Sequence, residues 1–398
     1  MSERVPEGWR YNSIAECCEI LDSQRIPLNS EERSKRLGEY PYYGANGIQG
    51  YIDDFIFDGD AILVAEDGGN FDQYAERPIA QWVTGKYWVN NHAHILRAKE
   101  NDLDKWIFYS LVHKNILKFI NGGTRAKLNQ SDLREIQISL PPLPEQKKIA
   151  SILTSVDEVI ETTQKQIDKL QDLKKATMNE LLTKGIGHTE FKDSELGRIP
   201  KSWGINQLGD YVKCQGGNAF PSSEFGKIGI PVVRISNIKN GLVDLSGCVH
   251  FSESEQFKRF IVFEGEILLA MSGATTGKIG VYKAKSPAYL NQRVGRFRIE
   301  DKKNVDSAFL NHLVQSEIFA DATLRDAIGG AQPNISSSQV ESVIYAFPTL
   351  SEQKVIASIL NSVDHKIDVQ NAKLNQTQSL KKSLMQDLLT GKVRVQVN

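Results

Sequence analysis

The sequence predicts an α+β protein in which two globular α/β regions are joined by two long helices. These helices are expected to pair as an antiparallel coiled coil, with a pseudo-twofold internal repeat relating the two halves. The first observation behind this prediction is that residues 143–183 recur as residues 350–390, at an offset of 207 and with 21 of 41 positions identical. The second is a heptad spacing of apolar residues through both copies. The third is that short apolar runs, separated by glycines and polar turns, precede each copy.

The composition is that of an ordinary globular protein of two or three domains. The chain has 398 residues, of which 40% are hydrophobic and 24% charged, and this excludes a disordered, a collagen-like or a disulfide-scaffold protein. No apolar run is long enough to span a membrane, and the first residues lack the pattern of a signal peptide, so a cytoplasmic location is expected. The four cysteines form no Cys-x-x-Cys pair and are expected to be reduced thiols.

The charge is nearly balanced overall but unevenly distributed. Lys and Arg number 48 and Asp and Glu 49, which by itself argues mildly against a nucleic-acid-binding protein. However, residues 267–299 contain six basic and no acidic residues, and residues 105–131 are also basic and free of acids. These two windows are therefore candidates for contact with a polyanion.

Each copy of the repeated segment is predicted to form one long helix with a narrow apolar seam. Pro144 and Ser351 stand at the predicted starts, each followed by glutamate, and Gly185 and Gly391 follow the predicted ends as C-terminal caps. A helix with one apolar stripe is unstable alone, so each is expected to pack on the other copy, although homodimerisation through the same stripes is an alternative. The predicted coiled-coil residues are Ile149, Leu153, Val156, Ile160, Ile167, Leu170, Ile356, Leu360, Val363, Ile367, Leu374 and Leu388.

The regions that precede the two copies differ from each other in sequence, and we call them the variable regions. Both are predicted to mix strands and helices. Residues 61–65 and 267–271 are short apolar runs typical of buried strands, and residues 40–51 form an aromatic, glycine-rich turn-and-strand pattern. Residues 106–120 and 308–328 are expected to be amphipathic helices.

No motif of catalysis or of metal or nucleotide binding meets its physical requirements. Residues 273–279 resemble a phosphate-binding loop, but only three residues separate the glycines and Ile279 follows Lys278. His92 and His94 would share one face of a strand, yet no cluster of cysteines or carboxylates accompanies them, so no metal site is expected. Glu190-Phe-Lys192 lies in a linker and is taken as chance. The sequence therefore favours a binding function.

The basic windows contain side chains that suit DNA. Lys and Arg can neutralise phosphates, and Arg, Asn and Gln can form paired hydrogen bonds with base edges. A solvated surface strand is an equally good interpretation on charge alone. The candidate DNA-binding residues are Arg125, Lys127, Arg234, Asn237, Lys278, Asn291, Gln292, Arg293, Arg296 and Arg298.

At this point the arrangement resembles a known family. Each variable region begins near a Pro-x-x-Trp motif, at Pro6 and Pro200, and ends in a segment containing Glu-Gln-x-x-Ile-Ala-Ser-Ile-Leu. This pattern is similar to the DNA-specificity subunit (HsdS) of type I restriction–modification systems. Residues 40–52, 191–203 and 267–282 also resemble segments of that family. The similarity covers nearly the whole chain, and only the first 40 residues match loosely.

The resemblance implies that each variable region is a target recognition domain that contacts one half of a bipartite double-stranded DNA site. It also implies that the helices act as a spacer and dock two methyltransferase subunits, which restriction (translocase) subunits then join. The chain itself would be non-catalytic and bind no cofactor, because S-adenosylmethionine, ATP and magnesium would belong to the partners. No membrane partner is implied. The implied divisions are recognition domain 1 (1–142), spacer helix 1 (143–184), a linker (185–198), recognition domain 2 (199–349), spacer helix 2 (350–391) and a C-terminal tail (392–398).

Within this interpretation the acids Glu66 and Asp67 are expected to accept hydrogen bonds from cytosine amino groups. Two other hypotheses remain open. A self-contained restriction–methylation enzyme would need catalytic motifs that this sequence lacks. The other is a coiled-coil scaffold that binds only proteins. A measurement of DNA binding distinguishes such a scaffold from a DNA-reading subunit.

Overall fold

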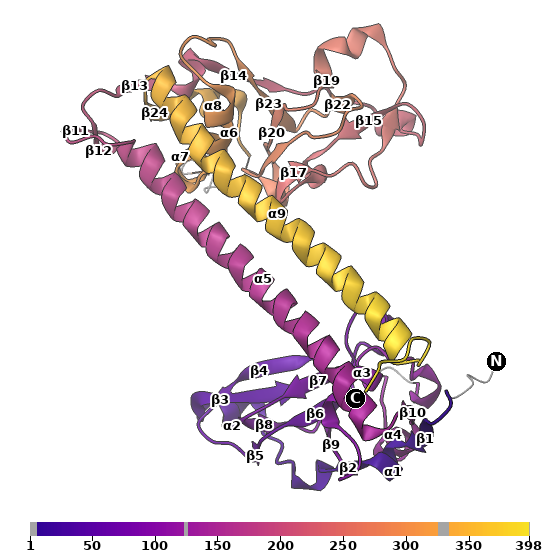
Figure 1. The fold of residues 1–398 in the computed structure, drawn as a ribbon. Coiled ribbons are helices and arrows are strands. Elements are labelled where there is room, and N and C mark those ends of the chain that lie inside the picture. The colour runs from indigo at the N-terminus through magenta and orange to yellow at the C-terminus, as the bar shows by residue number, and fades with distance from the viewer. Residues whose placement is uncertain (1–5, 123–125, 325–333, 398) are drawn as a thin grey trace. The chain divides into compact units, whose positions relative to one another are not determined.

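The computed structural model describes residues 6–122, 126–324 and 334–397. The chain divides into two compact units: unit 1 comprises Met1–Gln164 and Ala372–Asn398, and unit 2 comprises Lys165–Asn371. The two long helices expected from the heptad seam are α5 (Leu143–Lys184) and α9 (Leu350–Leu388), and each unit contains a segment of both (Figure 1). No helix in the described part of the chain is long and apolar enough to cross a membrane.

Unit 1 is built on two four-stranded sheets. One has the order β2-β9-β6-β7 and the other β4-β3-β8-β5, in which only β3 and β8 run parallel. Strand β6 is entirely buried, as its continuous apolar run predicts, because it lies between two strands and beneath helix α3. The strands are β2 (Cys18–Ile20), β3 (Leu37–Gly44), β4 (Gly47–Ile52), β5 (Phe57–Asp58), β6 (Ala61–Ala65), β7 (Ala80–Val83), β8 (Lys86–Val89) and β9 (Ala93–Ala98).

A second group of elements in unit 1 connects these sheets to the long helix. Strand β1 (Arg10–Ser13) pairs with β10 (Gln137–Leu140), which leads directly into α5. The helices are α1 (Ile14–Cys17), α2 (Ser30–Ser34), α3 (Asp104–Leu111) and α4 (Gln130–Glu135). The expected helix over 106–120 is shorter than predicted, since α3 ends at Leu111 and a 3-10 turn (Leu117–Phe119) follows.

Unit 2 repeats this topology. The order β14-β23-β20-β21 matches β2-β9-β6-β7, with β17 and β16 added, and the order β18-β15-β22-β19 matches β4-β3-β8-β5. Its one parallel pair in the second sheet, β15 with β22, is equivalent to β3 with β8. The strands are β14 (Val212–Gly216), β15 (Ile230–Val233), β16 (Ile238–Lys239), β17 (Gly241–Val243), β18 (His250–Phe251), β19 (Ile261–Val262), β20 (Ile267–Ala270), β21 (Ile279–Val281), β22 (Ala288–Leu290) and β23 (Val294–Ile299).

Some of the remaining elements of unit 2 also have counterparts in unit 1. Strand β13 (Gly204–Gln207) pairs with β24 (Ile344–Phe347), as β1 pairs with β10. The predicted single helix over 308–328 is instead two helices, α6 (Ser307–Gln315) and α7 (Glu317–Leu324), because the Ser316 hydroxyl bonds to the Leu313 carbonyl and caps the second. Residues 325–333 lie outside the described ranges. Helix α8 (Ser337–Ser342) and a hairpin, β11 (Phe191–Ser194) with β12 (Gly197–Pro200), complete the unit.

The long helices run antiparallel within each unit. In unit 1 Asp157 of α5 contacts Lys381 of α9 at 2.5 Å, and Glu145 contacts Arg394, which follows α9. In unit 2 Lys174 of α5 contacts Asp364 of α9 at 2.6 Å. The two interhelical ion pairs are the same pair in the repeat, since 157 and 174 become 364 and 381 at the offset of 207. Every predicted coiled-coil residue is buried or half-buried.

The duplicated Glu-Gln motif joins each recognition region to its helix. Glu145 accepts a hydrogen bond from Trp9 Nε1 at 3.2 Å, and Glu352 accepts one from Trp203 Nε1 at 3.0 Å. The following residue, Gln146, accepts a hydrogen bond from the backbone N–H of Leu103 just before α3. Its counterpart Gln353 accepts one from Asp306 N just before α6, at the same distance of 2.9 Å. The tryptophan of the opening motif and the Glu-Gln pair therefore form one structural joint, which explains why both are duplicated.

Candidate nucleic-acid interface

Three loops of unit 1 meet at one edge of its sheets, which we call loop edge 1. They follow β3 (residues 44–47), follow β6 (66–69) and precede β9 (90–92). The second and third adjoin because β6 and β9 pair antiparallel, with Ala65 opposite Ala93. Together they enclose a cavity of about 240 Å³ lined by residues 45–49, Asp67, Gly68 and His92.

Hydrogen bonds between the loops hold loop edge 1 together. The Gln81 amide donates to the carbonyls of Gly44 at 3.1 Å and Ala45 at 2.8 Å. The Asn46 amide donates to the Gly68 carbonyl at 2.8 Å, and the backbone N–H of Glu66 donates to the His92 carbonyl at 2.8 Å. The cavity wall is therefore fixed by both backbone and side-chain bonds.

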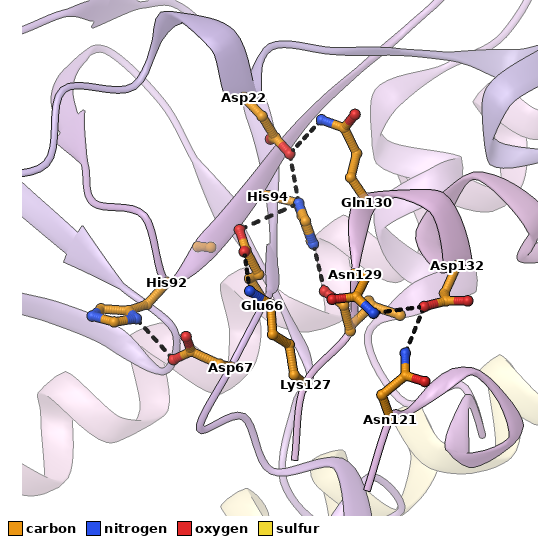
Figure 2. A network of polar contacts seen from close by, with 12 residues as sticks. Asp22, Glu66, Asp67, His92, His94, Asn121, Lys127, Asn129, Gln130 and Asp132 are labelled. Atoms are coloured by element: carbon orange, nitrogen blue, oxygen red, sulfur yellow. Dashed lines mark hydrogen bonds and ion pairs between the residues drawn. The ribbon is translucent and has the colours of Figure 1, made fainter. Parts of the chain in front are cut away.

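A charge network that includes Asp22, Glu66 and His94 adjoins loop edge 1 (Figure 2). His94 Nδ1 is 2.6 Å from Asp22 Oδ2, and its Nε2 is 2.9 Å from the Leu128 carbonyl oxygen. Because both neighbours are acceptors, both ring nitrogens must donate, which makes His94 an imidazolium. Burial raises the pKa of Asp22, but the hydrogen bond and positive charge of His94 outweigh it, so the pKa lies below its ordinary value.

Glu66 belongs to the same network. Its carboxylate contacts Arg25 at 2.8 Å and Lys127 at 3.2 Å. Asp22, Glu66 and His94 present potential metal-ligating atoms within 4.8 Å of one another. However, Arg25, Lys127 and the imidazolium already balance both carboxylates, so the cluster fits an ion-pair network that rigidifies the loop edge.

Unit 2 has the corresponding loop edge, which we call loop edge 2. Its loops are residues 234–237 after β15, 271–276 after β20 and 291–293 before β23. The backbone N–H of Met271 donates to the Arg293 carbonyl, as Glu66 donates to His92. Ser272 and Asp67 each form an isolated bridge with a downstream loop, and the glycine after each has a left-handed backbone (φ 78° at Gly273 and 65° at Gly68). Asp67 and His92 are therefore equivalent to Ser272 and Arg293.

Loop edge 2 brings together five of the predicted DNA-binding residues: Arg234, Asn237, Asn291, Gln292 and Arg293. Gln292 and Arg293 are exposed, and their side chains have no hydrogen bond or ion pair with any described residue. Lys278 is exposed in the same way at the end of the loop after β20. Arg298 is exposed on β23 and donates to Gln215 at 3.3 Å.

Two predicted DNA-binding residues are corrected by the structure. Arg296 is only 4% exposed, and its guanidinium donates to Glu266, Gln215 and the carbonyls of Ile261 and Arg259. Asn237 is also buried and donates to the Asp244 carbonyl while accepting from the Arg234 backbone N–H. Both side chains are committed to internal hydrogen bonds and stabilise the fold.

The residues of unit 1 that the sequence predicts to contact DNA differ in their surroundings. The carboxylate of Glu66 contacts Arg25 and Lys127, and its contact with a base stays a prediction. Asp67 does line the cavity. Lys127 is half-exposed and paired with Glu66, and Arg125 lies outside the described residues. Asn46 and Gln49 were missed, although the Gly-Ala-Asn-Gly turn at residues 44–47 marked the position of this loop.

Residues 6–172 and 200–378 each match the family model described as the type I restriction modification DNA specificity domain. The chain belongs to this family. The resemblance predicted from the duplicated motif is thus confirmed, and the two matched ranges each contain one variable region and most of the helix that follows it. This specificity subunit therefore carries the family domain twice.

Relatives of the specificity subunit match it along nearly its whole length. It is 32% identical to the specificity subunit of the type I restriction enzyme MjaVIII of Methanocaldococcus jannaschii, over 98% of this chain and 94% of the relative. It is 33% identical to the putative MjaX specificity subunit of the same organism, over 98% and 95%. The S subunit of a type I system from M. genitalium has the same fold, with a TM-score of 0.63, 15% identity and coverage of 98% and 97%.

Proposed function

We propose that each unit of this specificity subunit reads one half of a bipartite site in double-stranded DNA. The observation that carries the proposal is the repetition of the loop edge with different polar side chains at equivalent backbone positions. Asp67 and His92 in unit 1 correspond to Ser272 and Arg293 in unit 2. Two similar scaffolds with different hydrogen-bonding groups are what two different half-site sequences require.

The chemistry of loop edge 2 favours contact with DNA. Arg293 is a fork of hydrogen-bond donors that matches the O6 and N7 acceptors of guanine, and Gln292 beside it can donate and accept. Lys278 and Arg298 add exposed positive charge from the acid-free window and suit phosphates.

We further propose that the subunit is non-catalytic and binds no cofactor of its own. Two methyltransferase subunits would dock on the helices, restriction (translocase) subunits would join them, and S-adenosylmethionine, ATP and magnesium would belong to these partners. Leu173 and Leu380 support the presence of two docking surfaces, because they occupy the same position in the repeat and each is 52% exposed. The unbroken lengths of α5 and α9, 42 and 39 residues, support a role in setting the gap between half-sites.

The test is an exchange of recognition regions. Residues 1–142 are replaced by the corresponding region of a relative, the gene is expressed with its methyltransferase, and the methylated sites of the genome are sequenced. One half-site should change and the other should stay the same. A change in both halves would mean that the two units form one composite reading surface. If the unaltered chain neither bound DNA nor directed its methylation, a scaffold that binds only proteins would be favoured.

A further inference from the structure

We propose that the β3–β4 hairpin of unit 1 reads a thymine, with Ile48 contacting its methyl group and Gln49 donating a hydrogen bond to its O4. This inference rests on the proposed function, because it names a base of the first half-site. It goes beyond that function by assigning the base to two specific side chains.

A β-bulge places these two side chains next to each other. Strands β3 and β4 pair so that Tyr42 lies opposite Gly50 and Tyr43 opposite Ile48, which leaves Gln49 as an extra residue on β4. Consecutive side chains of a regular strand point to opposite faces, whereas a bulge re-aims one of them. Ile48 is 48% exposed, Gln49 is also exposed, and both line the cavity of loop edge 1. The hairpin therefore presents an apolar group and an amide at the same site.

The loop before β9 orients the Gln49 amide. The backbone N–H of His92 donates to Asn90 Oδ1 at 2.8 Å, so the Asn90 amide nitrogen faces the other way and donates to Gln49 Oε1 at 3.1 Å. Arg33 adds a longer contact of 3.5 Å to the same oxygen. Gln49 Nε2 lies against Gly44, where an added Cβ would be 2.2 Å from it and would displace it. This nitrogen donates to no residue that the structure describes, so Gln49 offers DNA a hydrogen-bond donor whose direction the protein sets.

Other polar side chains that line the cavity are bonded within loop edge 1. Asp67 Oδ1 is 2.8 Å from His92 Nδ1 (Figure 2), and the Asn46 amide donates to the Gly68 carbonyl at 2.8 Å. These contacts form the wall against which a base would lie. The Gln49 amide nitrogen adds a donor, and Ile48 adds an exposed aliphatic surface.

Thymine is the base that matches this pair of groups. In the major groove it presents the O4 acceptor together with the methyl group on C5. Cytosine carries an amino donor in place of O4 and has no methyl group, so it matches neither side chain. Guanine and adenine offer acceptors to the amide nitrogen but no methyl group to the isoleucine. A donor beside an aliphatic side chain thus matches thymine at two points, each purine at one and cytosine at none.

The experiment uses the full chain with its methyltransferase. The exchange of residues 1–142 assigns the first half-site, and binding is then measured on duplexes in which each of its thymines is replaced in turn by uracil, which lacks only the methyl group. At one position this replacement should weaken wild-type binding about fourfold, as expected for one buried methyl group. Ile48→Ala should weaken binding to the natural site by a similar or larger factor and should not respond to uracil at that position.

A matched control shows that the response belongs to Ile48. Ile26 is an isoleucine of the same unit, 53% exposed, that does not line the cavity. Ile26→Ala should therefore keep the full wild-type response to uracil. Ile48 and Gln49 are both exposed, so their variants should unfold at the wild-type temperature.

The hydrogen bond to O4 is tested with 4-thiothymine. This base keeps the methyl group and the pairing with adenine but replaces O4 by sulfur, a weaker acceptor. At the position found with uracil it should weaken wild-type binding by about 2- to 10-fold, the range for one hydrogen bond. Gln49→Leu should not respond to the sulfur, whereas Gln73→Leu, at an exposed glutamine outside the cavity, should respond as the wild type does.

Two results would overturn the inference and leave the proposed function intact. One is a first half-site in which no thymine methyl group affects wild-type binding. The other is a response to uracil in Ile48→Ala, or to the sulfur in Gln49→Leu, that equals the wild-type response, because other residues would then contact that base. A wild type that directs methylation to no bipartite site would instead overturn the proposed function.

Discussion

In unit 1 the loop edge presents an oriented carboxylate, Asp67, whereas the equivalent edge of unit 2 presents an exposed guanidinium, Arg293. The order of the four strands that the two sheets share is the same, and in both units the residue after β6 or β20 donates a backbone hydrogen bond to the residue before β9 or β23. The side chains on these loops differ in the sense of the hydrogen bonds that they offer. The comparison teaches that the two units share a core scaffold and carry different polar side chains at equivalent loop positions.

Beneath the loop edges the two units also use different buried charges. Unit 1 places the imidazolium of His94 between Asp22 and the Leu128 carbonyl. In unit 2 the strand position that pairs equivalently carries Gly295, and the buried charge is the next residue, Arg296, bound to Glu266. Each unit thus has its own internal network, while the joint made by Trp9 with Glu145 and by Trp203 with Glu352 is the same in both.

The largest expected effect is on stability and concerns Arg296, which the sequence predicts to contact DNA but which the structure buries. Arg296→Ala would remove the guanidinium that bonds to Glu266 and to two backbone carbonyls and should lower the free energy of unfolding by about 3–5 kcal/mol. Arg298→Ala, two residues further along the same strand and exposed, should change it by less than about 0.5 kcal/mol. Urea denaturation of the two variants checks this, and equal stability would contradict the internal role of Arg296.

A smaller effect, on binding and not on stability, is expected for Arg293. Arg293→Ala should weaken binding by about 1–3 kcal/mol and relax specificity at one position of the second half-site if the arginine reads guanine. If it contacts a phosphate, the loss should be uniform across sequences and the salt slope should fall by about one. Lys285→Ala is the control, because Lys285 is an exposed cation of the same window outside the loop edge. Unchanged affinity and salt dependence for Arg293→Ala would remove loop edge 2 from the DNA interface.

The smallest effect concerns the contact of each recognition region with the paired helices. In unit 1 the hydroxyl of Tyr109 donates to Asp157, and in unit 2 His312 contacts Asn361 and lies near Asp364. Burial lowers the pKa of His312, despite its hydrogen bond with Asn361 and the charge of Asp364. Burial raises the pKa of Tyr109, so the tyrosine does not titrate near neutral pH.

The lowered pKa of His312 sets the direction in which stability changes with pH. As the pH falls through the ordinary histidine value of about 6.5, the unfolded chain binds a proton that the folded chain does not, so stability falls. The contribution of His312 should be at most about 1.4 kcal/mol per pH unit. Urea denaturation at pH 7.5 and 5.5 should show a smaller difference for His312→Gln than for the wild type. His365→Gln, at an exposed position of α9, should behave like the wild type, and the same pH dependence in all three proteins would contradict a neutral buried His312.

The sequence by itself determined the features that depend on local periodicity and on repetition. The heptad seams of the two copies predicted both long helices, because the spacing of apolar residues directly sets which helix face is buried. Their antiparallel pairing was predicted from a pseudo-twofold relation between the two copies. The offset of 207 predicted two equivalent halves and, through its motifs, the family. The structure adds that the interhelical ion pairs follow the same repeat, since Asp157 and Lys174 recur as Asp364 and Lys381.

Only the tertiary structure decided which polar residues face outward. Arg293 and Arg296 lie in one acid-free window, and the sequence could not separate the exposed one from the buried one. Arg293 lies in the loop before β23, whereas Arg296 lies on β23 and is enclosed by Glu266 and Gln215, which folding brings beside it. Likewise, Glu66 and Asp67 are neighbours in the chain, but Arg25 and Lys127, distant in sequence, neutralise the first, while His92 orients the second toward the cavity. A side chain's role at such an edge is set by partners that folding brings together, and no local pattern records them.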